Sequence, residues 1–443
     1  METAGEQKMM TENPKRTGAL LIAAAPVLVA GSVAWVFPSE TAAVLGHWAL
    51  PALSLSALFL ALGLAIEWRG LRILLVVLAT TLVLGWNRSS ATSTSHFAGA
   101  CLGLLLMLVV GRAVDTQRRM RLAMLTFLST GMVMLFLGLA GASLQPGTPL
   151  VSMLPVKLPG IRLGLSGLAG GDVNPNALAA AVLLVAPLAM SVLILGTREK
   201  TDWLGLLPLA FAVAAMGAVI MAISRSRTAW IAVWLILVGL LVRSVRSALS
   251  RFIVGAFVAA PLFVVSTNVV FLSQEEFAVE ASHFWQTAHD RAEIMTQGLA
   301  CWRQSPWLGV GLNEFRSMYK PADIDLAHAH NIFLQIALDV GAVGSAAYWG
   351  LMTFLFMRAG QAAKGPSGPG RSAAAGSAIS LVAVILFGLL DAVPLGSKIG
   401  LFQWMTSGLI LAAWRTRSVV NCLPGTHGTA SAHDVRRRCH GDG

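Results

Sequence analysis

Long apolar runs alternate with short polar connections along almost the whole 443-residue chain. Each run holds about 18 to 22 residues, enough for a helix to cross roughly 30 Å of hydrocarbon. Arg, Lys, Gly or Pro bounds each run. A membrane β-barrel would instead show short segments of alternating polarity. The pattern therefore predicts an all-α polytopic membrane protein with about 12 transmembrane helices.

The apolar runs place these helices to within a few residues. We expect them near 18–37, 44–66, 71–86, 97–114, 122–141, 176–196, 203–223, 228–242, 252–272, 329–357, 374–391 and 399–414. The first run follows basic residues, as a signal peptide would, but it is about 20 residues long and eleven more runs follow it. It is therefore predicted to be an uncleaved first helix.

The same pattern divides the chain into segments. They are a short N-terminal segment, helices 1–9 with one long outer loop, a second long outer loop with an amphipathic helix, helices 10–12 and a basic tail. Their predicted ranges are 1–17, 18–272 with the loop at 142–175, 273–328, 329–414 and 415–443.

Charge gives the predicted orientation. Only 12% of residues are charged and 56% are hydrophobic, whereas about a quarter are charged in soluble domains, so a soluble enzyme is excluded. With the N-terminus inside, 22 of the 32 Lys and Arg residues fall on the inner side, which predicts both termini in the cytoplasm. The net charge of +11 is thus a topology signal, and we expect no nucleic-acid partner.

Two long outer loops are the expected place for function, because long loops in compact folds tend to carry it. The first ends in Asn174-Pro175-Asn176, which suits a helix N-terminus. The second contains a helical repeat of apolar residues, predicted to lie on the bilayer surface: Trp285, Ala288, Ala292, Met295, Leu299 and Trp302. Arg291 borders this apolar face, so it either points into the protein or extends along the membrane surface.

Arg225 and Arg227 lie at the outer end of a short span. Residues 228–242 form only about 22 Å of helix, which places both arginines at or below the outer headgroups. Charges there are costly unless they face a polar cavity or a charged ligand. A guanidinium fits phosphate oxygens bidentately, so the hypothesis is a phosphate site open to the outer leaflet. The alternative is simple headgroup anchoring.

A histidine pair follows the second loop. His328 and His330 directly precede Asn331 and the tenth span, where they could act as a base, a ligand or headgroup contacts. Together with Asp323 and Asp325 they also have a spacing compatible with a divalent metal. We favour a metal-free site, because acidic residues are common in loops and spacing does not establish coordination geometry.

At these residues the sequence resembles the superfamily of O-antigen ligases and O-antigen polymerases, bacterial inner-membrane glycosyltransferases. Five stretches carry the resemblance, in order and on the same predicted side of the membrane. They are residues 171–179 with the Asn-Pro-Asn segment, Ser226-Arg227-Thr228-Ala229, the loop signature of Arg291, Trp302, 305–311 and Phe315, the pair His330-Asn331 with Gln335, and Gly341-x-x-Gly344. The last two are typical of the ligase branch.

The resemblance implies a reaction and roles for residues. A polysaccharide on undecaprenyl pyrophosphate would be transferred to a lipid A-core hydroxyl at the periplasmic face of the inner membrane, by inversion and without a cofactor or metal. Arg227 and Arg291, with Arg225, would bind the donor pyrophosphate, and His330 would be the base. His328, Asn331 and Asn176 would support the site.

Other functions remain open from the sequence. A polymerase or a protein O-oligosaccharyltransferase would use the same donor and the same residues. A transporter or flippase is disfavoured, because its polar residues would be expected near the bilayer midplane, whereas the ionisable residues here gather at the outer face.

Overall fold

The computed structural model describes residues 14–36, 48–66, 68–87, 90–141, 174–196, 205–224, 226–244, 289–319 and 328–422. All regular elements in these ranges are helices, as predicted. They include α2 (Pro14–Val36), α4 (Ala49–Leu64), α5 (Arg69–Leu84), α6 (Ala91–Ala113), α7 (Gln117–Gly141), α10 (Pro175–Gly196), α11 (Leu206–Ser224), α12 (Arg227–Ser244), α15 (Phe315–Met318), α16 (Ile332–Ala363), α17 (Pro369–Phe387) and α18 (Gly400–Cys422), with a further helical segment at 289–302.

The long helices follow the predicted spans with shifts of up to eight residues at their ends. The fourth predicted span, near 97–114, for example, begins earlier as α6, because Ser90 caps this helix by accepting a hydrogen bond from the Ser93 N–H at 3.1 Å. The predicted ninth span at 252–272 lies outside the described residues, as do most of the loop 142–175, Asp323, Asp325, Arg225 and most of the tail.

Several described helices have the length and composition of membrane spans. Six are long and apolar enough by these criteria: α2, α6, α7, α10, α16 and α17. Three shorter apolar helices accompany them over Ala49–Leu64, Gly70–Leu84 and Leu206–Met221. The chain is therefore described as a multi-pass membrane protein.

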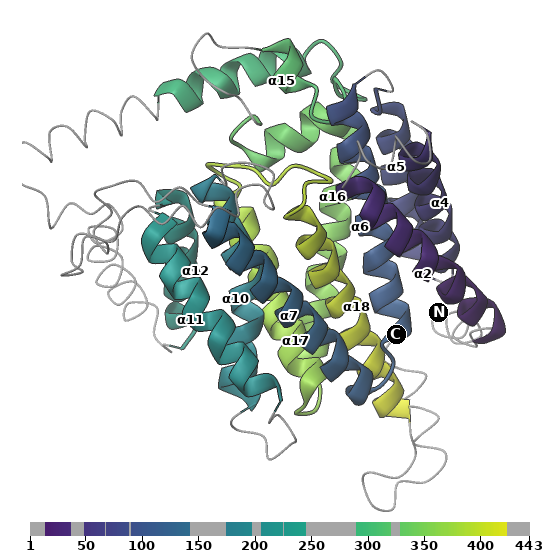
Figure 1. Ribbon diagram of the computed structural model, residues 1–443, viewed down its shortest axis with the longest axis vertical. Helices are drawn as coiled ribbons and strands as arrows, with labels where there is room; N and C mark the ends of the chain where they lie inside the picture. Colours follow the sequence, from purple (N-terminus) through teal and green to yellow (C-terminus); the bar gives the residue numbers. More distant parts are fainter. Residues whose placement is uncertain are drawn as a thin grey trace, which may run out of the picture.

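The helices form an upright bundle, with the short α15 and the polypeptide around it covering one end (Figure 1). Small residues allow close packing where polar groups are few, as is usual between membrane helices. A Cβ at Gly103 of α6 would lie 2.0 Å from the Trp404 ring of α18. Two serines tie α10 to α17, since Ser380 Oγ donates to Leu184 O at 2.8 Å and Ser191 Oγ donates to Ser372 O at 2.9 Å.

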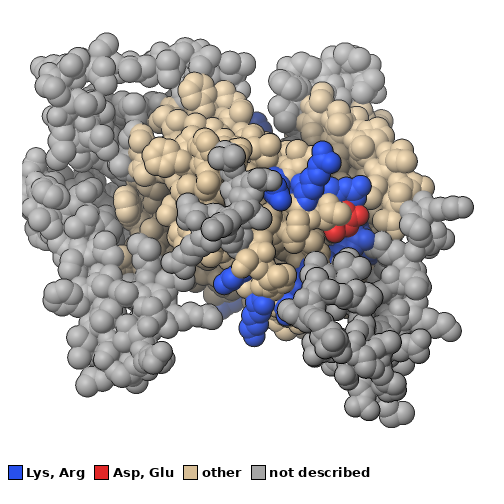
Figure 2. Space-filling model, turned by 90° about the horizontal axis from the view of Figure 1, so that it is seen from below, with Lys and Arg blue, Asp and Glu red and all other residues tan. Residues whose placement is uncertain are grey.

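Basic side chains gather on the opposite end of the bundle, the face seen in Figure 2. Some of them stabilise helix ends. The Arg112 guanidinium lies 4.0 Å from the centre of the Trp68 ring, and its Nε donates to Leu64 O at 3.1 Å. Because cations favour the C-terminal ends of helices, such contacts fit the end of α4. The count of Lys and Arg predicts that this face is cytoplasmic.

A break in α16 holds the outer loop against the bundle. Gly341 has φ +68° and ψ −175°, which interrupts the helix and frees backbone groups. The loop replaces the lost partners, because Val310 N–H donates to Leu338 O at 2.7 Å and Ala342 N–H donates to Pro306 O at 2.8 Å. The loop approaches so closely that a Cβ on Gly341 would lie 2.1 Å from Trp307 O. Glycine is therefore required at this position.

We expect Gly341→Ala to release the 305–311 loop and to lower thermal stability, because the new methyl group would overlap backbone atoms. Limited proteolysis of the purified protein and its thermal midpoint measure both effects. Gly360→Ala is the matched control in the same helix, since nothing lies within 4 Å of its Cβ position and alanine favours helices. Equal behaviour of the two variants would contradict the role of the break.

Candidate active site

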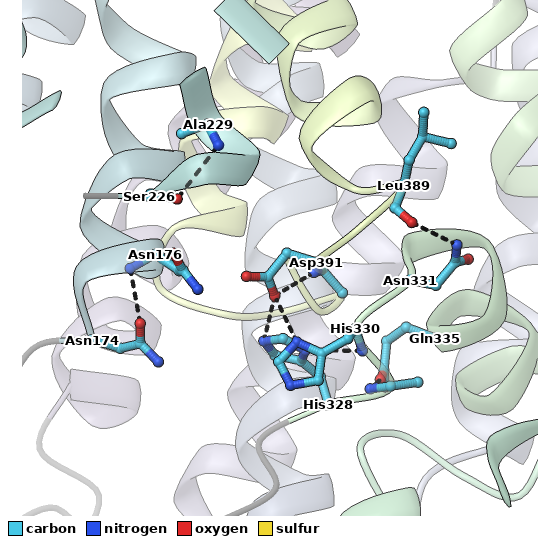
Figure 3. Close-up of polar contacts among 12 residues, drawn as sticks. Asn174, Asn176, Ser226, Ala229, His328, His330, Asn331, Gln335, Leu389 and Asp391 are labelled. Carbon is cyan, nitrogen blue, oxygen red and sulfur yellow. Dashed lines mark hydrogen bonds and ion pairs between the residues drawn. The ribbon is translucent and has the colours of Figure 1, made fainter. Parts of the chain in front are cut away.

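Three side chains from two distant segments meet above the bundle. His328 Nε2 lies 3.1 Å from Asp391 Oδ1, and His330 Nδ1 lies 3.4 Å from the same oxygen. The two imidazole rings are 4.6 Å apart and nearly perpendicular. Figure 3 shows Asp391 facing both rings, with the starts of α10 and α12 to one side and Asn331 to the other. One carboxylate thus serves two histidines.

The hydrogen bonds assign the proton of His328. Its Nδ1 accepts from the backbone N–H of His330 at 3.3 Å, so a neutral ring carries its proton on Nε2 and donates it to Asp391. Both nitrogens of His328 are then engaged. This ring fixes the position of the carboxylate and has no nitrogen left for a substrate.

His330 is arranged differently. Its Nδ1 faces Asp391, and no hydrogen bond joins its Nε2 to any residue that the structure describes. Its backbone is in the left-handed region, with φ +50°, which is uncommon for a residue other than glycine and often marks a functional position. A carboxylate behind one nitrogen of an imidazole orients the ring and makes the other nitrogen a better base.

The burial and charges of the cluster shift two of its pKa values. Burial lowers the pKa of His328 to about 4, with Asp391 opposing this shift and the neighbouring His330 and Arg291 adding to it. Burial alone would raise the pKa of Asp391, but the histidines and the Ala392 N–H hold the pKa of that carboxyl below its usual range. At neutral pH, a charged Asp391 therefore faces a neutral His328.

Asn331 joins the two segments that carry the cluster. Its Oδ1 accepts from the N–H groups of Phe333 and Leu334, both at 3.0 Å, which caps α16. Its Nδ2 donates to Leu389 O at 3.1 Å, two residues before Asp391. One asparagine therefore starts the helix after the histidines and holds the segment with their carboxylate beside them.

A second, buried network of hydrogen bonds holds the backbone between the two histidines. Gln335 Oε1 accepts from Ala329 N–H at 2.8 Å, and its Nε2 donates to Asp339 Oδ1 at 2.9 Å. The N–H of Asn313, in the outer loop, donates to the same Asp339 oxygen at 2.8 Å. Gln335 and Asp339 are 0% and 1% exposed. The backbone between the histidines, α16 and the outer loop are thus joined by three hydrogen bonds.

Arg291 lies on the helical segment 289–302, in the loop above the site. The buried positions of this segment are Ile294 and Gly298, and a Cβ at Gly298 would lie 2.9 Å from Leu334 Cδ2 of α16. Arg291 is one turn before Ile294, on the same side, and its charge acts on His328. Ala292 and Leu299 of the predicted apolar face are exposed, so they lie away from the buried side of the segment. The side with Arg291 is the one that packs inward.

Two capped helix starts complete the surroundings. Asn174 Oδ1 accepts from Asn176 N–H at 2.8 Å, which confirms the expected N-terminus at the start of α10. Ser226 Oγ accepts from Ala229 N–H at 3.4 Å and begins α12. Arg227 is the first residue of α12, at the same end of the bundle as the histidines, although its side chain lies outside the described part.

The cluster also has the composition of a possible metal site, since ligand atoms of His328, His330 and Asp391 lie within 4.8 Å of one another. Its hydrogen bonds do not fit one. A metal-bound histidine normally donates its second N–H to an acceptor, whereas His328 Nδ1 faces a donor, the His330 N–H. A proton on His328 Nε2, shared with Asp391, fits this arrangement better than a metal ion does.

Part of the chain matches a known protein family. Residues 211–349 match the family model described as O-antigen ligase. The resemblance to the O-antigen ligase family is thereby confirmed. The family match extends from α11 into α16 and includes Arg227, Arg291, His328 and His330, whereas Asn176 and Asp391 lie outside it. No curated protein matches the chain.

Asp391 is the residue of this cluster that the sequence did not single out. The apolar pattern placed it at the end of the predicted span 374–391, but α17 ends at Phe387 and Asp391 lies in the following loop. The available signal was an acidic residue at the outer end of a span, followed by Pro394 and Gly396. An ionisable residue at the end of a membrane span is by itself a reason to propose a functional role.

We expect the stability of the protein to fall as pH decreases from about 6.5 to about 4. Because the folded pKa of His328 is lower than its ordinary value of 6.5, the unfolded chain binds the proton first over this interval. Thermal midpoints across this pH range test the effect, and His328→Asn should flatten the curve.

His289→Asn is the control for that measurement, since His289 is exposed and lies outside the cluster. It should leave the pH curve of the wild-type protein unchanged. Parallel curves for wild type and His328→Asn would contradict the assignment.

Proposed function

We propose that the chain transfers a polysaccharide from undecaprenyl pyrophosphate to a lipid A-core hydroxyl at the periplasmic face of the inner membrane. The family match supports an O-antigen ligase or polymerase type of glycosyltransferase. The observation that carries the proposal is the shared carboxylate, which holds His330 with Nδ1 toward Asp391 and leaves Nε2 available. Such a group is suited to take a proton from a sugar hydroxyl.

In this mechanism the acceptor hydroxyl attacks the anomeric carbon of the donor directly. The new carbon–oxygen bond forms as the bond to the pyrophosphate breaks, the hydroxyl proton goes to His330 Nε2, and the bonding electrons leave with the lipid pyrophosphate. Attack from the face opposite to the leaving group inverts the anomeric centre. No covalent enzyme intermediate is required.

Arginines are assigned to the leaving group. Pyrophosphate gains negative charge as the bond breaks, and a fixed guanidinium stabilises that charge most in the transition state. Arg291 supplies one positive charge beside the histidines, as its effect on His328 indicates. Arg227, at the start of α12, supplies the second, and Arg225 is assigned a supporting role next to it.

Four residues are then positioning residues in this proposal. His328 holds Asp391 through its Nε2 proton, and Asn331 ties the Asp391 segment to the start of α16. Gln335 holds the backbone between the two histidines. Asn176 lies at the capped start of α10, on one side of the cluster. A displaced Asp391 would leave His330 in place but with a freely rotating ring, which lowers turnover more than binding.

The first test is transfer in vitro with purified protein, undecaprenyl-pyrophosphate-linked glycan and lipid A-core, with and without a chelator. We expect wild-type transfer to survive chelation. His330→Ala should lose about 10²- to 10⁴-fold in turnover, the usual contribution of a general base. Asp391→Asn should lower kcat with little change in KM and should shift the pH–rate profile.

Two results would oppose this proposal. Loss of wild-type transfer with the chelator would indicate a required metal. Lengthening of the glycan without capture by lipid A-core would indicate a polymerase with the same donor.

The arginines are tested by Arg227→Lys and Arg291→Lys. Lysine retains the charge but loses the planar fork that binds two phosphate oxygens, so we expect a strong loss of kcat in both variants. Arg303→Lys is the control, because Arg303 is exposed just beyond the helical segment of Arg291. Near-normal turnover in Arg227→Lys and Arg291→Lys would exclude a pyrophosphate clamp.

A further inference from the structure

Two large apolar side chains are exposed on the loop that closes the break in α16. Trp307 and Leu308 are 70% and 44% exposed. Their backbone is nevertheless fixed, because Trp307 O accepts a hydrogen bond from Val343 N–H at 3.4 Å and Gly309 N–H donates to Ser305 O at 2.9 Å. Exposed apolar groups on a fixed backbone are typical of a contact surface. The proposed transfer reaction assigns no role to either side chain.

The height of this loop in the bundle indicates what the surface meets. On α16 the loop is bound around Gly341, and the first charged residue beyond the break is Arg358, about 26 Å farther along the helix. On α5, Leu312 N–H donates to Gly85 O at 3.0 Å, and Arg72 lies about 20 Å along that helix. The hydrocarbon of a bilayer is roughly 30 Å thick, and arginines of membrane helices gather at its edges. Both helices therefore place the loop at the hydrocarbon edge on the side of the histidines.

The loop also adjoins the side of α16 that faces lipid. Between the break and Arg358, the exposed residues of this helix lie on one face and carry no charge: Val343, Ala346, Thr353 and Met357. An uncharged exposed row on a membrane helix is suited to acyl chains. Trp307 is bound to the first residue of this row through the N–H of Val343. The exposed apolar side chains of the loop thus begin where the lipid-facing row of α16 ends.

We propose that Trp307 and Leu308 insert into the lipid leaflet on the side of the histidines. The Trp307 indole then lies between headgroups and acyl chains, a place that suits a ring with an apolar body and one N–H donor. Leu308 contacts the upper acyl chains. Lipid thereby anchors the 305–311 loop, and with it the segment 289–302 that precedes the loop and carries Arg291. This inference does not depend on the proposed reaction.

Nitroxide labels on the full chain in phosphatidylethanolamine–phosphatidylglycerol vesicles test the insertion. Trp307→Cys and Leu308→Cys each receive a label in a chain whose four native cysteines, Cys101, Cys301, Cys422 and Cys439, are replaced by alanine. Electron paramagnetic resonance then measures how strongly the label is relaxed by oxygen, which concentrates in lipid, and by a nickel chelate, which stays in water. We expect both labels to show the high ratio of oxygen to nickel relaxation that marks lipid.

Two matched positions calibrate that ratio. Val343→Cys is the lipid reference, since it is exposed in the row of α16 just below the loop. Arg303→Cys is the water reference, since it is an exposed polar position four residues before Trp307. Labels at Trp307 and Leu308 that resemble the Arg303 label, relaxed mainly by nickel, would overturn the proposal in favour of a loop that faces water.

A second measurement keeps the native cysteines and needs only the mild change Trp307→Phe. The difference in tryptophan fluorescence between the wild type and this variant reports the emission of Trp307. In vesicles of phosphatidylcholine brominated near the top of its acyl chains, we expect most of that difference to disappear, because bromine quenches an indole only on close approach. A difference of equal size in brominated and unbrominated vesicles would show that Trp307 does not contact lipid, and would overturn the proposal even if the labelled chains fail to fold.

Discussion

The break in α16 at Gly341 is the constraint on which the outer half of the structure depends. Backbone groups within a membrane protein need hydrogen-bond partners, and the break leaves Leu338 O and Ala342 N–H without partners in their own helix. The 305–311 loop supplies these partners. Because the loop is fixed there, the helical segment before it lies over the start of α16. Arg291 is thereby carried to the side of His328, far from it in sequence but close enough to influence its pKa.

Several hydrogen bonds fix the short backbone segment that carries His328 and His330. It is held from one side by Gln335, from another by the Asn331 bond to Leu389 O, and from within by the bond between His330 N–H and His328 Nδ1. These contacts account for the left-handed backbone of His330, a conformation that persists only where surrounding structure enforces it. The strained residue is also the one whose Nε2 has no hydrogen bond to any residue in the described part of the chain.

Much of the bundle could be predicted from the sequence, because continuous apolar runs of sufficient length have few other stable conformations in a membrane. The positions of His328, His330, Asn331 and Arg291 near one another could be expected only through the family resemblance. Asp391 could not, since hydropathy does not distinguish the last residue of a span from the first residue of a loop. The inward side of segment 289–302 could not be identified from hydropathy either, because Gly298, which adds no hydropathy, permits a close contact with α16.

The distribution of the site along the chain has a consequence for biogenesis. Asn176 precedes the segment that matches the ligase family, the histidines lie within it, and Asp391 follows it, just before the last helix. During synthesis the histidines therefore emerge well before their carboxylate. A nascent or truncated chain that ends after α16 already carries Arg227, Arg291 and both imidazoles, but not the carboxylate that faces those rings. Under the proposed mechanism, catalytic competence is acquired only as α17 and α18 enter the membrane.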